Sequence, residues 1–139
     1  MVLNELDRYR DAGLLVLRIG IGIAFMVHGA PKLFGGPDYW AVVGQDGLAA
    51  FGITFLPAVW GFLAGLAEFG GAICLMLGVL TRPAAFFMMC TVLVAATGHV
   101  AGTIPGSPWH AIEAGVLFFS LLFIGPGAYS LDAYFGATR

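Results

Sequence analysis

The chain has 139 residues, of which 60% are hydrophobic and only 10% are charged, and its formal net charge is −2. A soluble domain averages roughly 25% charged residues, so this composition excludes a soluble globular fold, and the lack of a basic patch argues against a nucleic-acid partner. The length fits one domain, residues 1–139, and the hydropathy places it in a lipid bilayer.

The predicted elements are all helices, and Gly and Pro residues separate them. A charged lead-in, residues 1–13, comes before the first helix over residues 14–34. We expect this lead-in to stay cytoplasmic, because no small-x-small cleavage site follows the first apolar run. Three further helices are predicted over residues 55–80, 83–100 and 109–124, each ending near glycine or proline. The predicted fold class is therefore all-α, an integral membrane bundle of four transmembrane helices.

The basic residues predict the orientation of these four spans. An even number of spans puts both termini on one side of the membrane. That side holds Arg8, Arg10, Arg82 and Arg139, whereas the other side has only Lys32. By the positive-inside rule, both termini are cytoplasmic. We expect a multi-pass protein of the plasma (inner) membrane.

The first outer loop, residues 34–55, contains a short amphipathic segment. Its apolar residues recur at helical spacing, opposite Gln45 and Asp46. They are Trp40, Val43, Gly47, Leu48 and Phe51. The segment is either a helix on the membrane surface or over the mouth of the bundle, or an ordered loop with apolar contacts.

Small residues predict which helices touch. Gly61, Ala64 and Gly65 lie on neighbouring turns of the second helix, and the first helix carries Gly20, Gly22 and Ala24. Small side chains let backbones approach closely in lipid. We therefore expect the first two helices to pack along these faces.

Few ionisable residues fall within the spans, and each is costly there, so each is a candidate functional residue. They are Arg18, His28, Lys32, Glu68, His99, His110 and Glu113. We predict that Arg18 pairs with Glu68 inside the bundle. The alternative is that Arg18 extends to the cytoplasmic interface and leaves Glu68 as a neutral acid.

All three histidines lie near the predicted outer end, together with Glu113. Such groups could bind a metal, relay protons beside a quinone headgroup, or bond only to loops and water. No tight ligand motif such as H-E-x-x-H is present, so we predict no metal site. Cys74 and Cys90 do not form a C-x-x-C pair, which argues against thiol catalysis.

Four stretches of the sequence resemble the DoxX family. They are Leu17-Arg18-Ile19-Gly20 through His28-Gly29-Ala30-Pro31-Lys32, Glu68-Phe69-Gly70-Gly71 with Leu77-Gly78-Val79-Leu80-Thr81-Arg82, Glu113, and Gly125-Pro126-Gly127-Ala128-Tyr129-Ser130-Leu131-Asp132. The resemblance implies a four-span protein similar to the small membrane subunit of thiosulfate:quinone oxidoreductase. It carries over Arg18, His28, Lys32, Glu68, Arg82 and Glu113, but neither His99 nor His110.

The predicted function is that of a membrane subunit of an oxidoreductase system, which binds a quinone or a small thiol- or sulfur-related molecule. In this hypothesis Arg18 and Glu68 organise the core, Lys32 and His28 hold an oxygen of the ligand, and Glu113 handles a proton. No flavin, haem or iron–sulfur motif is present, so we expect no intrinsic cofactor and a redox partner that carries one. The alternatives are a non-catalytic anchor or assembly module and passage of a small neutral solute. Enzyme status and oligomeric state, homo-oligomer included, stay open.

Overall fold

The computed structural model describes residues 2–136, and all regular elements in that range are helical. In chain order they are η1 (Val2–Tyr9), α1 (Arg10–Phe34), α2 (Gly36–Leu48), η2 (Ala49–Phe51), α3 (Pro57–Leu77), α4 (Thr81–Ala101), α5 (Trp109–Ile124) and α6 (Leu131–Gly136). The predicted all-α class is confirmed. The four long predicted helices agree with α1, α3, α4 and α5 to within about one turn.

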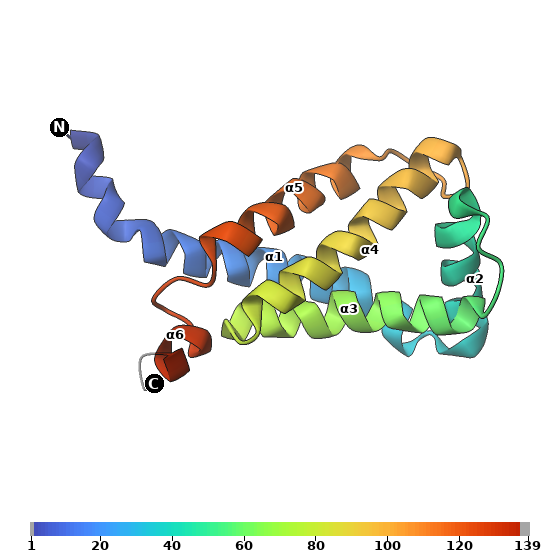
Figure 1. Ribbon diagram of the computed structural model, residues 1–139, viewed down its shortest axis with the longest axis horizontal. Helices are drawn as coiled ribbons and strands as arrows, with labels where there is room; N and C mark the ends of the chain where they lie inside the picture. The colour runs from blue at the N-terminus through green and yellow to red at the C-terminus, as the bar shows by residue number, and fades with distance from the viewer. Residues whose placement is uncertain (1, 137–139) are drawn as a thin grey trace.

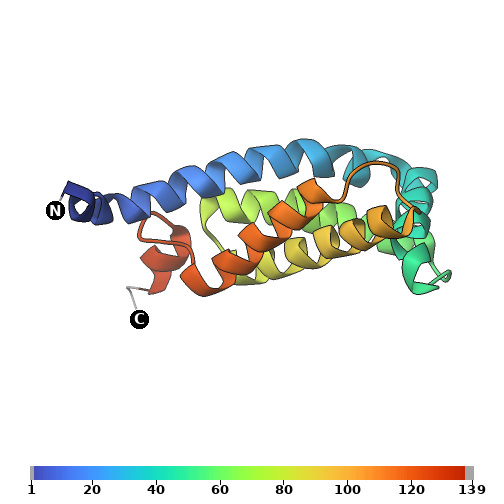
Figure 2. The same cartoon turned by 90° about the horizontal axis from the view of Figure 1, so that it is seen from above.

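The long helices pack in sequence, with α1 against α3, α3 against α4, and α4 against α5 (Figures 1 and 2). An edge-to-face contact between Phe25 and Phe118, with ring centroids 4.9 Å apart, connects α5 to α1. Both ends of the described chain lie at one end of the bundle (Figure 1). We call this the proximal end and the opposite one the distal end. Which of the two faces the cytoplasm stays a prediction.

Glycines bring α1 and α3 into close contact. A Cβ atom on Gly29 would lie 2.6 Å from the Phe69 backbone nitrogen, and one on Gly22 would lie 3.1 Å from the Ala72 carbonyl oxygen. The predicted packing of these helices is therefore confirmed, but three of the expected contact residues are wrong. Gly61 packs on the backbone of Trp40, which lies in the helix after α1, Gly36–Leu48. Gly20 and Ala24 are exposed, because the face at helical spacing that meets α3 is the one with Gly22 and Gly29.

The amphipathic segment of the first loop is a helix, α2, which crosses the distal end of α3 (Figure 1). Here the contact is closer still, because a Cβ atom on Gly44 would lie 1.9 Å from the Pro57 carbonyl oxygen. The Trp40 indole N–H donates to the Leu33 carbonyl oxygen at 3.2 Å, and the Thr103 hydroxyl donates to the Asp46 carbonyl oxygen at 2.9 Å. The short helix is thus confirmed, and the alternative of an ordered loop is wrong.

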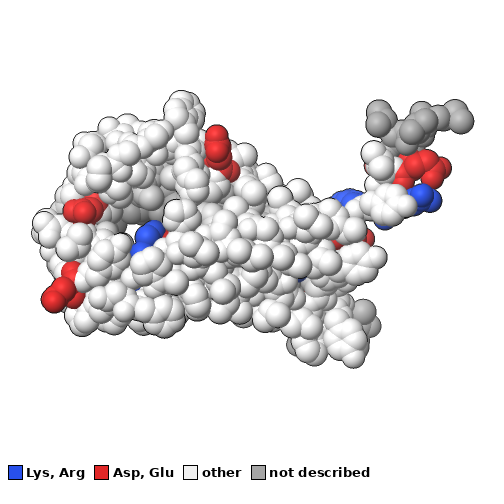
Figure 3. Space-filling view, turned by 180° about the vertical axis from the view of Figure 1, so that it is seen from behind, with Lys and Arg blue, Asp and Glu red and all other residues white. Residues whose placement is uncertain are grey.

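Length and composition support a membrane bundle. Three helices are long and apolar enough to cross a bilayer, namely α1, α3 and α4. The fourth, α5, has 16 residues, a rise of about 24 Å against a hydrocarbon core of about 30 Å, so its crossing stays a prediction. On the face shown in Figure 3, charged side chains lie mostly toward the two ends, and the surface between them is largely uncharged.

Candidate functional site

An ion pair between Lys32 on α1 and Glu68 on α3 lies toward the distal end. The ammonium Nζ is 2.7 Å from one carboxylate oxygen of Glu68 and 2.8 Å from the other. The Glu68 side chain is 4% exposed, whereas the Lys32 side chain is 28% exposed. The pair is therefore buried on its acidic side and accessible on its basic side, and Figure 3 shows basic atoms within a hollow at this end.

The fold explains why lysine is the partner of this carboxylate. A Cβ atom on Gly65 would lie 2.8 Å from the Lys32 carbonyl carbon, and one on Gly29 would lie 3.1 Å from the Glu68 carbonyl carbon. These glycines put the backbones of α1 and α3 in contact within a turn of both charges. The two long side chains then need to cover only a short distance.

The predicted Arg18–Glu68 pair is wrong. Gly29 marks the level of Glu68 on α1, and Arg18 lies 11 residues earlier, which is about 16 Å along the helix at 1.5 Å per residue. An arginine side chain does not span that distance. The alternative, in which Arg18 extends to the cytoplasmic interface and leaves Glu68 as a neutral acid, is wrong as well, since Arg18 is fully buried and Glu68 forms a salt bridge with Lys32.

Arg18 instead binds backbone oxygens at the proximal end. It donates from Nη1 to the Leu75 carbonyl oxygen at 3.2 Å and from Nη2 to the Tyr129 carbonyl oxygen. The guanidinium packs on Gly78, where a Cβ atom would lie 2.1 Å from Nη1 and where φ is +66°. Glycine meets both demands, because it tolerates the left-handed region and leaves room for the guanidinium.

Asp132 caps α4 from a distant part of the sequence. Its carboxylate accepts hydrogen bonds from the Leu80 and Thr81 backbone N–H groups, both at 2.9 Å. These are the free donors of a helix N-terminus, where a negative charge is favoured. Burial opposes ionisation of this carboxyl, but the hydrogen bonds from Thr81 and Leu80 and the charge of Arg18 outweigh it, so the pKa of Asp132 lies below its ordinary value.

Two of the predicted histidines meet at the distal end, and the third does not join them. His28 on α1 and His110 on α5 have ring centroids 5.1 Å apart, beside Phe25. His28 and Lys32 are one turn apart on α1 and so share a face. His99 is half-buried, and its Nδ1 lies 3.2 Å from the Ile104 carbonyl oxygen in its own loop. We call Lys32, Glu68, His28 and His110 the distal polar cluster.

Glu113 is exposed on α5, and within residues 2–136 no salt bridge involves it. In the same range, no group of three or more His, Cys, Asp or Glu residues is placed to hold a metal ion. The role of Glu113 as a proton carrier stays a prediction. Arg82 is exposed, and its Nε donates to the Leu122 carbonyl oxygen at 2.9 Å.

Three contacts at the proximal end were not predicted from the sequence. Asp132 caps α4, the Tyr129 carbonyl binds Arg18, and Asp11 accepts from the Ala128 N–H at 3.0 Å. The sequence does contain a signal for the cap by Asp132, because this aspartate follows the Gly-Pro-Gly turn that ends the last predicted transmembrane helix. A backbone carbonyl has no signature in the sequence.

Comparison with known proteins identifies relatives of the chain over nearly its whole length. An uncharacterized protein of Haemophilus influenzae is 32% identical, over 96% of this chain and 98% of its own. Inner membrane protein YphA of Escherichia coli is 30% identical, over 90% and 96%. Inner membrane protein YqjF of the same organism is 32% identical, over 91% and 95%. No solved structure matches.

The apolar helices and their buried charges define a multi-pass helical membrane protein, and its relatives confirm the predicted location in the inner membrane. The DoxX family model matches residues 13–101. The chain belongs to the DoxX family, as the resemblance implied.

Proposed function

We propose that this protein is a membrane subunit of an oxidoreductase system, in which the distal polar cluster holds the headgroup of a quinone. One observation carries the proposal. A lysine ammonium has three donors, and Glu68 accepts from two of them while the Lys32 side chain is 28% exposed. One charged donor is therefore left for a ligand at the edge of a buried pair.

The charge of the cluster favours a quinone over an anionic thiol- or sulfur-related ligand. Lys32 and Glu68 neutralise each other, so a free anion gains little net attraction there. A quinone is uncharged and presents carbonyl oxygens, which accept hydrogen bonds from an ammonium or an imidazole N–H. His28 and His110 lie at the same end and are exposed, which supports a role for them at the rim of the site.

The electrons would come from elsewhere. A quinone takes up two electrons and two protons on reduction, and a protein without its own redox centre supplies only binding, orientation and protons. We therefore propose a partner protein that carries the cofactor. In this proposal the histidines and Glu113 serve as proton carriers at the mouth of the bundle, since imidazole changes charge near neutral pH.

The test is quinone binding by the protein in lipid nanodiscs. Decylubiquinone is titrated into nanodiscs that contain the wild type or Lys32→Gln/Glu68→Gln, in which two amides replace the ion pair without leaving a lone charge. A hydrogen bond to a charged group contributes about 1.5–3 kcal/mol, so we expect the double variant to bind at least about tenfold more weakly. Ser120→Ala is the control, because that hydroxyl donates to its own helix at the Val116 carbonyl oxygen. Equal binding by all three proteins would refute the proposal.

The second candidate is a non-catalytic anchor or assembly module. The observation in its favour is that Lys32 and Glu68 join α1 to α3 beside Gly29 and Gly65, so the pair could serve helix packing alone. In that case the wild type binds no quinone, and the double variant keeps all partner binding in a pull-down from solubilised membranes.

A further inference from the structure

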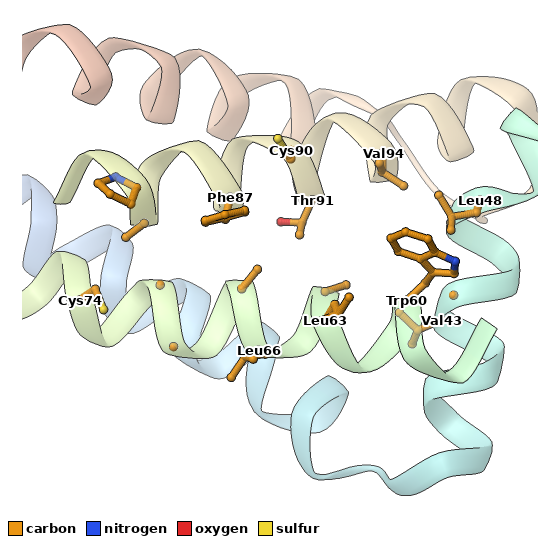
Figure 4. Close-up of a pocket in the computed structure, with 18 of the residues that line it drawn as sticks. Val43, Leu48, Trp60, Leu63, Leu66, Cys74, Phe87, Cys90, Thr91 and Val94 are labelled. Carbon is orange, nitrogen blue, oxygen red and sulfur yellow. The ribbon is translucent and has the colours of Figure 1, made fainter. Parts of the chain in front are cut away.

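A long apolar groove runs between α3 and α4, and α2 covers its distal end. Its volume is about 720 Å³. Trp60 lies near one end and Cys74 near the other, with Leu63, Phe87 and Thr91 between them (Figure 4).

The groove is separate from the distal polar cluster. α3 presents Ala67, Gly70 and Cys74 to the groove, whereas Gly65 and Glu68 on the same helix contact α1. The two sites therefore occupy different faces of α3. A molecule in the groove would bind there whether or not the distal polar cluster holds a quinone.

The length of the groove suits an extended chain as its occupant. From Trp60 to Cys74 the groove follows α3 for about 21 Å at 1.5 Å per residue. A single hydrocarbon chain of this length lies along the groove without leaving it.

The lining of the groove suits an occupant that is apolar along its length. None of the described residues that line it is charged. The Thr91 hydroxyl already donates to the Met88 carbonyl oxygen of its own helix at 2.8 Å. At the distal end the Trp60 indole lies half-way out of the groove, and its N–H has no hydrogen-bond acceptor in residues 2–136, as is common where tryptophan meets the membrane interface.

The charge of α2 and the length of the groove indicate which kind of membrane lipid fits. Lipid phosphates are bound by basic side chains, yet the helix over the distal end, α2, carries Asp38 and Asp46 and no Lys or Arg. A groove of about 21 Å also exceeds half of a hydrocarbon core of about 30 Å, so its occupant passes the midplane, where the acyl chains of one leaflet end. We propose that the groove binds the isoprenoid chain of an uncharged prenyl lipid, with its polar end near Trp60.

Two glycine variants provide a matched test. A Cβ atom on Gly70 would have only the Leu66 side chain nearby, at 3.8 Å, so the backbone leaves room for the start of a side chain there, and Gly70→Leu directs that side chain into the groove. Gly20 lies on the exposed face of α1 with nothing within 4 Å of its Cβ position, so Gly20→Leu makes the same change in open space. Both variants put a better helix former in place of glycine.

The experiment is photolabelling of the wild type and both variants in nanodiscs that contain geranylgeraniol with a diazirine group, followed by mapping of the labelled peptides. In a parallel sample, a phosphatidylethanolamine with a diazirine on its acyl chain replaces the prenol at the same mole fraction. We expect the prenol to label the groove segments of α3 and α4, with at least fivefold less label in Gly70→Leu and no change in Gly20→Leu. The proposal is overturned if the phospholipid labels the groove as strongly as the prenol, if label spreads evenly over α1, or if Gly70→Leu labels like the wild type.

Discussion

The two ends of the bundle handle a buried positive charge in opposite ways. At the proximal end Arg18 is fully buried and donates to two backbone carbonyl oxygens. At the distal end Lys32 has a carboxylate partner and remains partly exposed. A fully buried charge whose hydrogen bonds go to backbone carbonyls serves the architecture, whereas a charge with an open side and a spare donor is suited to a ligand.

The proximal contacts form one connected unit. Arg18 joins α1 to α3 and to the segment after α5, and Asp132 in that segment caps α4. Asp11 and the Ala128 N–H add a further connection from α1. Since every long helix is reached directly or through its adjoining loop, this end should resist unfolding more than the distal end.

The largest effect is expected at Arg18. Arg18→Met removes two charge-assisted hydrogen bonds, one of which joins the Tyr129 carbonyl to α1. We expect the free energy of unfolding in mixed SDS micelles to fall by about 3 kcal/mol, and limited proteolysis to cut the segment after α5 sooner. The control is Arg82→Met, which removes an exposed arginine with one bond to a carbonyl and should cost less than about 1 kcal/mol. Equal losses in both variants would contradict the role given to Arg18.

The sequence predicts the helices and the polar residues within them, but not which of these residues pair. The helix ranges follow from hydropathy and from Gly-Pro punctuation, and the set of polar residues was complete enough to contain Arg18, Lys32 and Glu68. Their pairing was not accessible, because it depends on the register and rotation between α1 and α3. Gly22 and Gly29 set that register, and glycines on two faces of α1 left the rotation undecided.

The next effect concerns the distal pair. Lys32→Met and Glu68→Gln should each destabilise the protein, and the double variant should lose less than the sum, with a coupling energy of about 1–2 kcal/mol. For Arg18→Met combined with Glu68→Gln, the losses of unfolding free energy should instead add within about 0.5 kcal/mol. These residues have no shared partner, and Arg18 lies about 16 Å along α1 from the level of Glu68. The two cycles are measured by the same SDS titration. Additive losses for Lys32 and Glu68, together with coupling between Arg18 and Glu68, would contradict the assignment of Glu68 to the distal pair.

The smallest effect is expected at Asp132, and pH reveals it. Burial raises the pKa of this carboxyl, and the hydrogen bonds from Thr81 and Leu80 act in the opposite direction. The net result is a pKa that is lowered in the folded protein. The cap therefore contributes stability that is fully present above the ordinary aspartate pKa of about 3.9 and is lost as the pH falls through the lower folded-state value. Asp132→Asn should lower the unfolding free energy by about 1 kcal/mol at pH 7. The difference from the wild type should shrink as the pH falls below about 4, which thermal unfolding in detergent at a series of pH values would measure. A difference that stays constant from pH 7 downward would mean that the carboxylate charge at the start of α4 does not hold the proximal end together.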